Sequence, residues 1–526
     1  MWHARGYHVL HEDVGDTMKG NVVIIGCGMA GLSAALQLVR QGDCMVHLVS
    51  DMMSERSQSC LAEGGINAAI GPGDSAELHC EETLKTGCGL ADAEALMAMA
   101  SAAPDIIREL DKWGVPFVKR TNHSVSVRRM GGQTCPRTAH TENGIGRQIM
   151  DVLIQQARKY EAEGRILRYV NWTFRALAKH DGCICGVWLE HLDTQEMQFV
   201  PGQVIMACGG LNGFFGNATG STANTGIAAA LLFADGVPFS NLEFIQFHPT
   251  TMRLKGKNLL ISESARSDGG RLFVLRDGKP YYFMDEKYPE LGNLMPRDIV
   301  SREECFLIKQ GAQVYLDLRG LPAKTYETTL AGIVSDCVLF AGIDPAKEPI
   351  PVEPGIHFFM GGIQVDRFHR SPVKGLYAAG ECACQYHGAN RLGGNSLLGA
   401  IHGGKTAAEA ALRSEPHTPD GFPEGKSPVP LPCFRMEPLQ SVMRAAMGLE
   451  RDKTQLENAL DAIEKVSVPD EIRLFGRAIL LSALNRTESR GSHFRSDYPD
   501  CDPAMRKSSV VRCCDGEIRF SWEGRS

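Results

Sequence analysis

The sequence predicts an α/β fold built on a parallel sheet, with a second domain inserted into it and helices after it. Three observations predict this organisation. A strand, a glycine-rich turn, a helix and a second strand follow one another over residues 21–50. Two later apolar strands, at 204–210 and 375–381, also run into glycine-containing ends. Apolar residues then recur on one helical face from Leu439 to Met447, which indicates a helical region over about 434–490.

The first unit is Rossmann-like. Its strand Asn21–Ile25 runs into Gly26-Cys27-Gly28-Met29-Ala30-Gly31 and an apolar helix. These glycines permit a tight turn, and the helix N-terminus offers free N–H groups to a pyrophosphate. The second strand, Met45–Ser50, ends in Ser50 where an acid usually binds ribose hydroxyls, and a serine hydroxyl can do the same. The unit therefore indicates dinucleotide binding, and its glycines argue against a membrane span at Val22–Val39.

The later strands extend this nucleotide-binding domain. One is Val204–Met206 followed by Ala207-Cys208-Gly209-Gly210, and the other ends in Ala378-Ala379-Gly380-Glu381. The long segment between them is predicted to be an inserted domain. Prolines and charges over 415–430 indicate a connector before the helices.

The composition excludes several classes of protein. Of 526 residues, 43% are hydrophobic and 22% charged, which is typical of a globular protein. The formal net charge of -7 gives no support for nucleic-acid binding. The 17 cysteines include no Cys-x-x-Cys pair, so the sequence predicts neither a metal site nor an iron–sulfur cluster. The cysteines are expected to be free thiols in a reducing cytoplasm. The first 20 residues lack the apolar core of a secretory signal, and Met18 is a candidate start.

The loop from His387 to Leu397 carries one arginine, Arg391, among glycines and small residues. A guanidinium can grip a carboxylate through two parallel hydrogen bonds, and the glycines let backbone approach a ligand. Histidines and arginines elsewhere could join it around a small dianion, although each alone is more often structural. The candidates are His248, Ser262, Glu263, Arg266, Arg297, His357 and Arg391.

Several motifs occur in an order that resembles one family, the flavoprotein subunits of succinate dehydrogenase and fumarate reductase, which includes L-aspartate oxidase. The matching segments are Gly26–Gly31, Ala62-Glu63-Gly64-Gly65-Ile66-Asn67, His248-Pro249-Thr250, Ser262-Glu263 with Arg266, Pro296-Arg297-Asp298, His357–Gly362, His387–Leu397 and Glu488-Ser489-Arg490-Gly491. The resemblance spans about 21–500.

The resemblance implies a Rossmann-like FAD-binding domain, an inserted α+β capping domain and a C-terminal helical domain. The expected boundaries are an N-terminal extension at 1–20, an FAD-binding domain at 21–248 and 358–414, a capping domain at 249–357, a linker at 415–433, helices at 434–505 and a tail at 506–526.

The family also implies roles for the candidate residues. His248, Ser262, His357 and Arg391 would bind a C4 dicarboxylate. Arg297 would donate or accept the proton opposite flavin N5, and Glu263 and Arg266 would relay protons to it. The flavin carries the hydride, while the protein supplies orientation and electrostatics. The residues expected around FAD are Gly26, Gly28, Ala30, Gly31, Ser50, Ser57, Ser59, Gly64, Gly65, Ala207, Gly209, Glu381, Ser396 and Leu397.

Two departures from the family refine these expectations. Gln58 stands where covalently flavinylated members carry histidine, so FAD is expected to be non-covalent. Aspartate oxidases resemble Arg-Glu-Gly-Gly-His where this chain has Arg129-Met130-Gly131-Gly132-Gln133, and their glutamate pairs with the substrate ammonium. Met130 cannot do so, and an unpaired buried ammonium is costly.

Fumarate–succinate chemistry is therefore favoured, with electrons exchanged through a separate iron–sulfur subunit. The protein would be cytoplasmic, or peripheral on the cytoplasmic face of a membrane through such partners. L-aspartate oxidase, which feeds NAD synthesis, and a non-catalytic flavin-bearing subunit stay open as alternatives. The absence of covalent flavin is compatible with the first alternative, because aspartate oxidases also lack it. The presence of His248, His357, Arg297 and Arg391 argues against the second.

Overall fold

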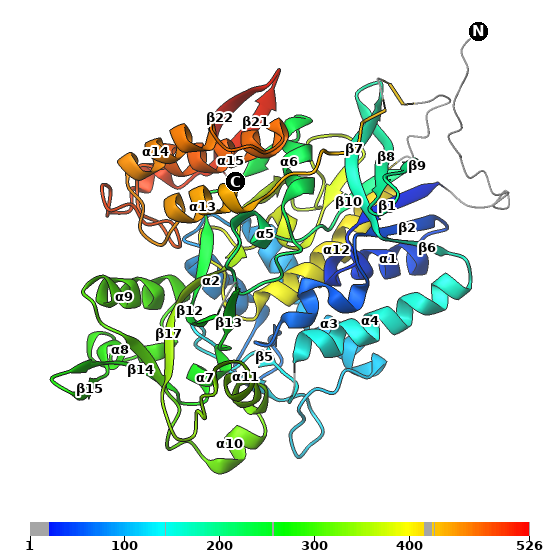
Figure 1. Cartoon of the computed structure of the whole chain (residues 1–526). Coiled ribbons are helices and arrows are strands. Elements are labelled where there is room, and N and C mark those ends of the chain that lie inside the picture. Colours follow the sequence, from blue (N-terminus) through cyan, green and yellow to red (C-terminus); the bar gives the residue numbers. More distant parts are fainter. Residues whose placement is uncertain (1–19, 143, 255–256, 415–422, 425–426, 525–526) are drawn as a thin grey trace, which may run out of the picture.

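A computed structural model describes residues 20–142, 144–254, 257–414, 423–424 and 427–524. The candidate start Met18 and most of the predicted N-terminal extension lie outside these residues. The centre of the fold is a five-stranded parallel sheet in the order β19-β10-β1-β2-β6 (Figure 1). Its strands are β1 (Asn21–Ile25), β2 (Met45–Ser50), β6 (Ile166–Val170), β10 (Gln203–Met206) and β19 (Leu376–Ala378). The four strands predicted from the sequence, β1, β2, β10 and β19, are thus neighbours in one sheet.

Helices α1 (Met29–Gln41), α4 (Ile145–Ala162) and α12 (Asn395–Arg413) pack around this sheet. Two glycines permit their close approach. A Cβ at Gly404 of α12 would collide with the Ala30 carbonyl of α1, and one at Gly31 would collide with the Gly26 carbonyl. Small residues therefore hold the two helices and the glycine turn together. Next to them lie α2 (Ala76–Thr86), α3 (Ala93–Trp113), a sheet of β3 (Ile66–Asn67), β4 (Val127–Arg128) and β5 (Thr138–Ala139), and a second of β7 (Trp172–His180), β8 (Cys183–His191) and β9 (Met197–Pro201).

The segment after residue 245 forms a separate cap at the bottom of the molecule (Figure 1). Its sheet has the order β13-β12-β17-β16-β14-β15, and its apolar core is its own. The chain enters along β12 and returns along β17, so the expected borders at 248/249 and 357/358 fall inside two paired strands. The cap contains β12 (Ile245–Leu254), β13 (Lys257–Leu260), α7 (Ser264–Ser267), β14 (Arg271–Arg276), β15 (Lys279–Tyr281), α8 (Phe283–Lys287), α9 (Arg297–Lys309), β16 (Val314–Asp317), α10 (Ala323–Glu327), α11 (Ala331–Ala341) and β17 (Ile350–Phe359).

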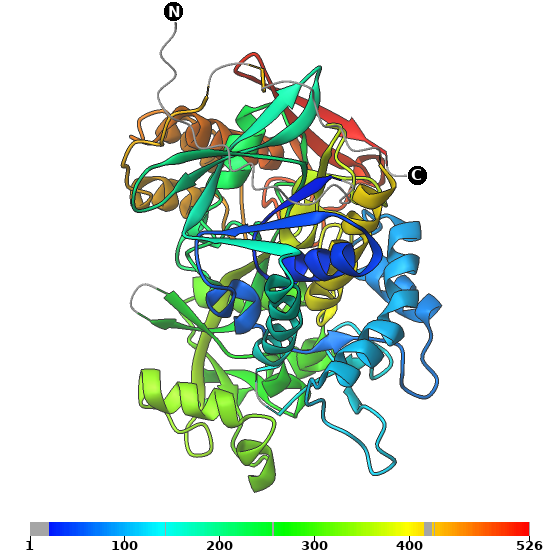
Figure 2. The same ribbon diagram turned by 90° about the vertical axis from the view of Figure 1, so that its right-hand side faces the viewer.

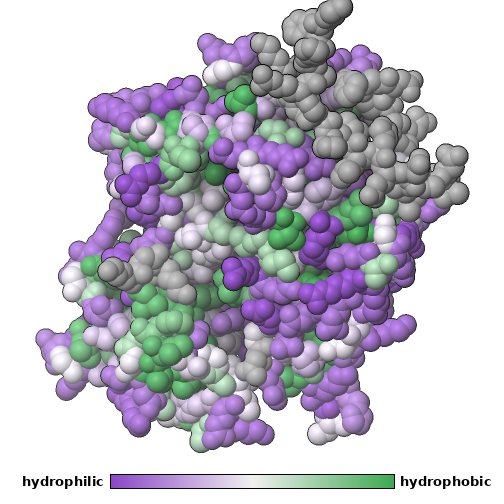
Figure 3. Space-filling view, turned by 45° about the vertical axis from the view of Figure 1, so that its right-hand side comes forward, coloured by the Kyte–Doolittle hydropathy of each residue, from purple (hydrophilic) through white to green (hydrophobic). Residues whose placement is uncertain are grey.

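The cap also carries exposed apolar side chains. Figure 3 shows apolar residues gathered on the lower part of the molecule. Three consecutive ones, Val338, Leu339 and Phe340, lie on α11 and are 51%, 73% and 48% exposed. Phe340 also lines the cavity described below, so this apolar area continues to the cavity wall.

The predicted C-terminal helices are α13 (Glu437–Ala446), α14 (Lys453–Ile463) and α15 (Asp470–Asn485). They pack with α5 (Asn212–Phe215) and α6 (Ile227–Ala234) on the side of the sheet opposite α1. No helix among the described residues is long and apolar enough to cross a membrane.

The expectation of a tail at 506–526 was wrong. Strands β21 (Ser508–Cys514) and β22 (Glu517–Glu523) form a hairpin there. Strand β21 pairs with β11 (Phe239–Ser240), and the same sheet holds β18 (Gly362–Gln364) and β20 (Ala383–Cys384). Asp515 and Gly516 turn the chain with φ of 52° and 81°, as an Asp-Gly hairpin turn requires. The hairpin lies at the end of the molecule away from the cap (Figure 2).

Candidate active site

A cavity of about 550 Å³ lies between the central sheet and the cap. Its walls come from the β1–α1 turn, the segment after β2, the start of α12 and the cap strands. All but two of the residues predicted around cofactor and substrate line it. Those lining it are Gly26, Gly28, Ala30, Ser50, Ser57, Ser59, Gly64, Gly65, Ala207, Gly209, His248, Ser262, Glu263, Arg297, His357, Glu381, Arg391, Ser396 and Leu397.

The two exceptions are Gly31 and Arg266. Gly31 is not part of the cavity wall, because its missing Cβ lets α1 pack on the preceding turn. The structure thus gives Gly31 a role in helix packing, and its contact with the cofactor stays a prediction. Arg266 lies behind Glu263, buried at 2% exposure, where it can act only through that carboxylate.

The glycine turn forms part of the cavity wall. Gly26 has φ of 115°, and a Cβ there would collide with the Ala207 carbonyl. Gly28 precedes α1 and has no side-chain cap. Met29 N donates to Ser59 Oγ at 3.0 Å and Gly26 N donates to the Val49 carbonyl at 2.8 Å, so the remaining N–H groups of this turn are available to an anionic group.

The end of β2 offers an acid that sequence reasoning missed. The Ser50 hydroxyl donates to the Met52 carbonyl, so its proton is already engaged. Asp51, the next residue, lines the same cavity and is exposed. Its position directly after a strand of the nucleotide-binding unit was the available signal.

The carboxylate of Glu381 is held by two parts of the fold. Its Oε1 accepts a hydrogen bond of 3.0 Å from Phe359 N at the end of β17. A Cβ at Gly210 would collide with this carboxylate, so the paired glycines after β10 make room for it. Together with the glycine turn and Asp51, this wall could hold an FAD: the α1 N-terminus would receive its phosphates, and the two acids would face its hydroxyl groups.

Gln58 also faces this part of the cavity. Its side-chain carbonyl accepts a hydrogen bond from Ser221 N, which ties it to the loop after α5. The segment Ser57-Gln58-Ser59 lines the cavity here and contains no histidine that could link to a flavin.

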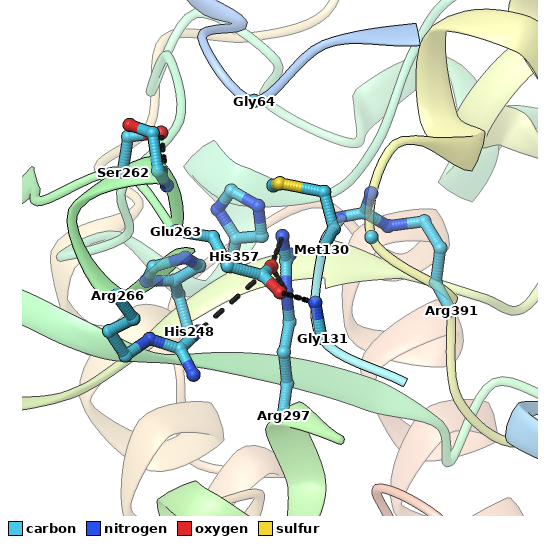
Figure 4. A network of polar contacts seen from close by, with 12 residues as sticks. Gly64, Met130, Gly131, His248, Ser262, Glu263, Arg266, Arg297, His357 and Arg391 are labelled. Atoms are coloured by element: carbon cyan, nitrogen blue, oxygen red, sulfur yellow. Dashed lines mark hydrogen bonds and ion pairs between the residues drawn. The ribbon is translucent and has the colours of Figure 1, made fainter. Parts of the chain in front are cut away.

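At the other end of the cavity, Arg297, Glu263 and Arg266 converge (Figure 4). Arg297 is the first residue of α9 and donates to Glu263 Oε2 from Nε at 2.8 Å and from Nη2 at 2.6 Å. Arg266 Nη2 lies 3.9 Å from the same oxygen. One carboxylate thus sits between two guanidinium groups, and Arg297 stands on its cavity side.

The fold holds Glu263 in its charged form. Burial alone would raise its pKa, but the charges of Arg297 and Arg266 and the hydrogen bonds from Arg297 and Gly131 N lower it to about 2. The Gly131 N–H lies 2.6 Å from Oε1. This contact was not predicted from the sequence, since it depends on how the 129–133 loop meets the cap.

Met130 lies beside the cavity, not in its wall. It is fully buried, and its sulfur accepts a hydrogen bond of 3.6 Å from Ser267 Oγ. A Cβ built on Gly64, which does line the cavity, would be 3.5 Å from the Met130 methyl carbon. Gly64 therefore lies between Met130 and the cavity.

His248 and His357 face one another with ring centroids 5.0 Å apart. Burial, then the charge of Arg297, lowers the pKa of both well below the usual value, so both rings are neutral. His248 Nδ1 lies 3.2 Å from the Thr250 carbonyl and must carry a proton there. His357 Nδ1 lies 2.7 Å from the Thr219 hydroxyl, which orients this ring and was not predicted.

Arg391 reaches the same place from the loop before α12. Its guanidinium lies 4.3 Å from the centroid of the Phe358 ring, and its Nε has no hydrogen-bond partner among the described residues. Burial and the nearby Arg297 charge lower its pKa well below the usual value for arginine. A bound anion would relieve both effects.

Gln246 links the two arginines and was also missed. It accepts from Arg297 Nη1 at 3.1 Å and donates to the Arg391 carbonyl at 2.8 Å. Its place two residues before His248, on the same side of β12, was the only sequence signal. This end of the cavity is therefore cationic and rich in hydrogen-bond donors. It is formed by Arg297, Arg391 and the two histidines, next to buried Ser262.

Comparison with known proteins agrees with this geometry. A family model described as FAD binding domain matches residues 21–397, and one described as fumarate reductase flavoprotein C-term matches 470–523. The chain belongs to this family. It is an FAD-dependent oxidoreductase of the succinate dehydrogenase and fumarate reductase type.

Relatives with different activities are similar to the chain. The succinate dehydrogenase flavoprotein subunit of Bacillus subtilis is 34% identical, covering 92% of this chain and 92% of its own. The L-aspartate oxidase of Mesorhizobium japonicum is 33% identical, covering 96% and 97%. A solved structure of E. coli quinol fumarate reductase has a TM-score of 0.84 at 26% identity, covering 96% of each chain. Overall similarity therefore gives the family and leaves the substrate to the site.

Proposed function

We propose that this protein interconverts fumarate and succinate. The observation that carries the proposal is Arg297, which joins the Glu263 carboxylate to a cavity end where Arg391, His248 and His357 meet. A dianion of this size offers carboxylate oxygens at both ends, and the protein offers donors on both sides of Arg297.

Binding would use Arg391, whose Nε has no hydrogen-bond partner among the described residues, together with the polar groups around it. Arg391 grips one carboxylate, and His248 and His357 with Ser262 hold the other. Since the binding groups are fixed by Gln246, Thr219 and Thr250, they need little reorganisation when the substrate arrives. The substrate carbons are then held close to Arg297.

Proton transfer follows the chain of contacts behind the substrate. In fumarate reduction Arg297 donates a proton to carbon, and Glu263 passes the next proton from Arg266 to Arg297. The low pKa of Glu263 suits it to brief protonation, because the proton moves on at once to the more basic guanidine. Succinate oxidation uses the same path in reverse. FAD bound along the glycine turn supplies hydride transfer.

We propose that FAD is held without a covalent bond to residue 58, since Gln58 takes the place of the linking histidine. We also propose an iron–sulfur subunit as the electron partner, which would bring the protein to a membrane surface on its cytoplasmic side. The relatives named as flavoprotein subunits support this arrangement.

L-aspartate oxidation is the second candidate, supported by relatives such as the Mesorhizobium japonicum enzyme. Met130 argues against it. The thioether cannot pair with an ammonium, and the Glu263 carboxylate at this end of the cavity is already shared by two arginines. A non-catalytic flavin-bearing subunit is the third candidate, and the complete set of donors argues against it.

Turnover assays with purified protein compare the three candidates. We expect succinate to reduce the oxidised flavin and L-aspartate to leave it oxidised. Flavin reduction by L-aspartate and not by succinate would contradict the proposal and support the second candidate. In Arg297→Lys we expect kcat to fall far more than substrate affinity, and an unchanged kcat would remove Arg297 from proton transfer.

A further inference from the structure

Glu304 is a buried carboxyl group without a role in the reaction described so far. It lies on α9, seven residues after Arg297, and the buried residues Arg297, Val300, Ser301 and Glu304 share one helix face. Glu304 is 0% exposed. One helix thus carries the residue at the substrate and, two turns further, a second titratable group inside the cap.

The hydrogen bonds of Glu304 are incomplete. Neither of its carboxylate oxygens has a hydrogen-bond partner among the described residues, and the same holds for Nε and Nη2 of Arg266. Arg266 has only one such bond, from Nη1 to the Asn293 carbonyl at 2.6 Å. Glu304 and Arg266 are thus two buried groups whose charges act on each other, and they hold free acceptors and free donors that a water could complete.

The surroundings of Glu304 favour its protonated form. Burial raises its pKa well above the usual value for glutamate, and the charge of Arg266 lowers it only in part. A charged carboxylate without hydrogen bonds would be far more costly in this place than a carboxylic acid. Glu304 thus holds a proton near the inner end of the Arg297–Glu263–Arg266 chain.

We propose that Glu304 is a further relay residue, which resupplies a proton to Arg266 through a bridging water. This inference rests on the proposed fumarate–succinate reaction. After Arg266 has passed its proton to Glu263, the O–H bond of Glu304 breaks and its proton reaches the neutral guanidine nitrogen. The products are a carboxylate and a guanidinium that stabilise each other, and no electrons move in this step. Succinate oxidation reverses it.

Glu304 touches neither the substrate nor the FAD site and acts through Arg266. Its effect should therefore appear in proton transfer and not in binding. Glu304→Gln keeps the size and polarity but has no proton to give. Glu303→Gln is a matched control on the same helix, because Glu303 instead accepts from Lys287 at 2.6 Å and from the Tyr288 hydroxyl at 2.9 Å.

The test measures fumarate reduction by the full-length, FAD-loaded protein with a reduced dye as donor. In Glu304→Gln we expect kcat to fall roughly 10- to 100-fold and the solvent deuterium isotope effect on kcat to rise, with succinate affinity unchanged. Glu303→Gln should match the wild type. Wild-type values of kcat and isotope effect in Glu304→Gln would overturn the inference.

Infrared spectroscopy gives a second readout that needs no turnover. The wild type should show the C=O stretch of a buried carboxylic acid, which Glu304→Gln loses and Glu304→Asp shifts. If Glu304→Gln does not fold, the wild type and Glu304→Asp still decide, because absence of the band in the wild type overturns the proposal. A wild type that turns over neither fumarate nor succinate would overturn the proposed function and this inference together, whereas an active wild type with an equally active Glu304→Gln refutes only the inference.

Discussion

Replacing Glu263 with glutamine removes the one anion between Arg297 and Arg266. The carboxylate accepts two hydrogen bonds from Arg297 and one from Gly131 N, and a glutamine amide must turn an NH2 group toward one of these donors. In the wild type, the pKa of the Glu263 carboxyl is about 2, below the ordinary value of 4.5. At about 1.4 kcal/mol per unit, this shift corresponds to roughly 3 kcal/mol of stability at neutral pH.

The sign of the pH dependence follows from the lowered pKa. Glu263 stabilises the folded protein fully above its unfolded pKa of 4.5, and this contribution is lost as the pH falls toward about 2. Glu263→Gln should therefore be destabilised at pH ~7 by about 3 kcal/mol, and less so as the pH falls below the unfolded value.

Urea unfolding followed by tryptophan fluorescence measures this difference. Glu353→Gln is the control, since Glu353 forms an ion pair with the 70%-exposed Arg253 side chain, and such surface pairs contribute at most about 1 kcal/mol. We also expect Glu263→Gln to lose about 10²- to 10⁴-fold in kcat. A loss of stability no larger than that of the control would refute the electrostatic reasoning.

Three further predictions follow from the site. Met130→Glu should raise kcat/KM for L-aspartate about tenfold, or about 1.4 kcal/mol, because it places a carboxylate near Gly64. No gain in steady-state assays would contradict the interpretation of the 129–133 loop. Succinate binding should take up a proton, because neutral His248 uses its Nδ1 proton on Thr250 and its pKa must rise before Nε2 can donate to a carboxylate. Calorimetry in buffers of different ionisation enthalpy measures this uptake. Affinity should fall as the pH rises above the lowered pKa of free His248, because binding must then take up a proton, and binding without proton exchange would refute the prediction. Acid precipitation should release the yellow flavin into solution, whereas colour kept in the pellet would show a covalent link.

The local features of the fold were predictable from the sequence. The glycine turn, the strands at 21–25 and 45–50 and the helix that follows the turn depend on residues close together in the chain, and the structure has them where predicted. The 508–523 hairpin was missed although Asp515-Gly516 is a strong turn signal. Its partner β11 lies more than two hundred residues earlier, and nothing in the local sequence reveals that pairing.

The site shows the same division. Residues in short motifs, such as His248 and Arg391, could be named because their neighbours marked them. Gln246, Thr219 and Gly131 could not, because each acts through a contact with a distant segment that only the folded cap creates. Gly31 was assigned to the cofactor by its motif, whereas its missing Cβ serves helix packing. Glu304 had no signal beyond its helical spacing from Arg297.

The most direct test of fumarate–succinate chemistry is anaerobic mixing of the reduced protein with fumarate, followed by flavin absorbance in a stopped-flow instrument. We expect rapid reoxidation that saturates with fumarate concentration and is lost in Arg297→Lys. A flavin that stays reduced in the presence of excess fumarate would contradict the proposed function.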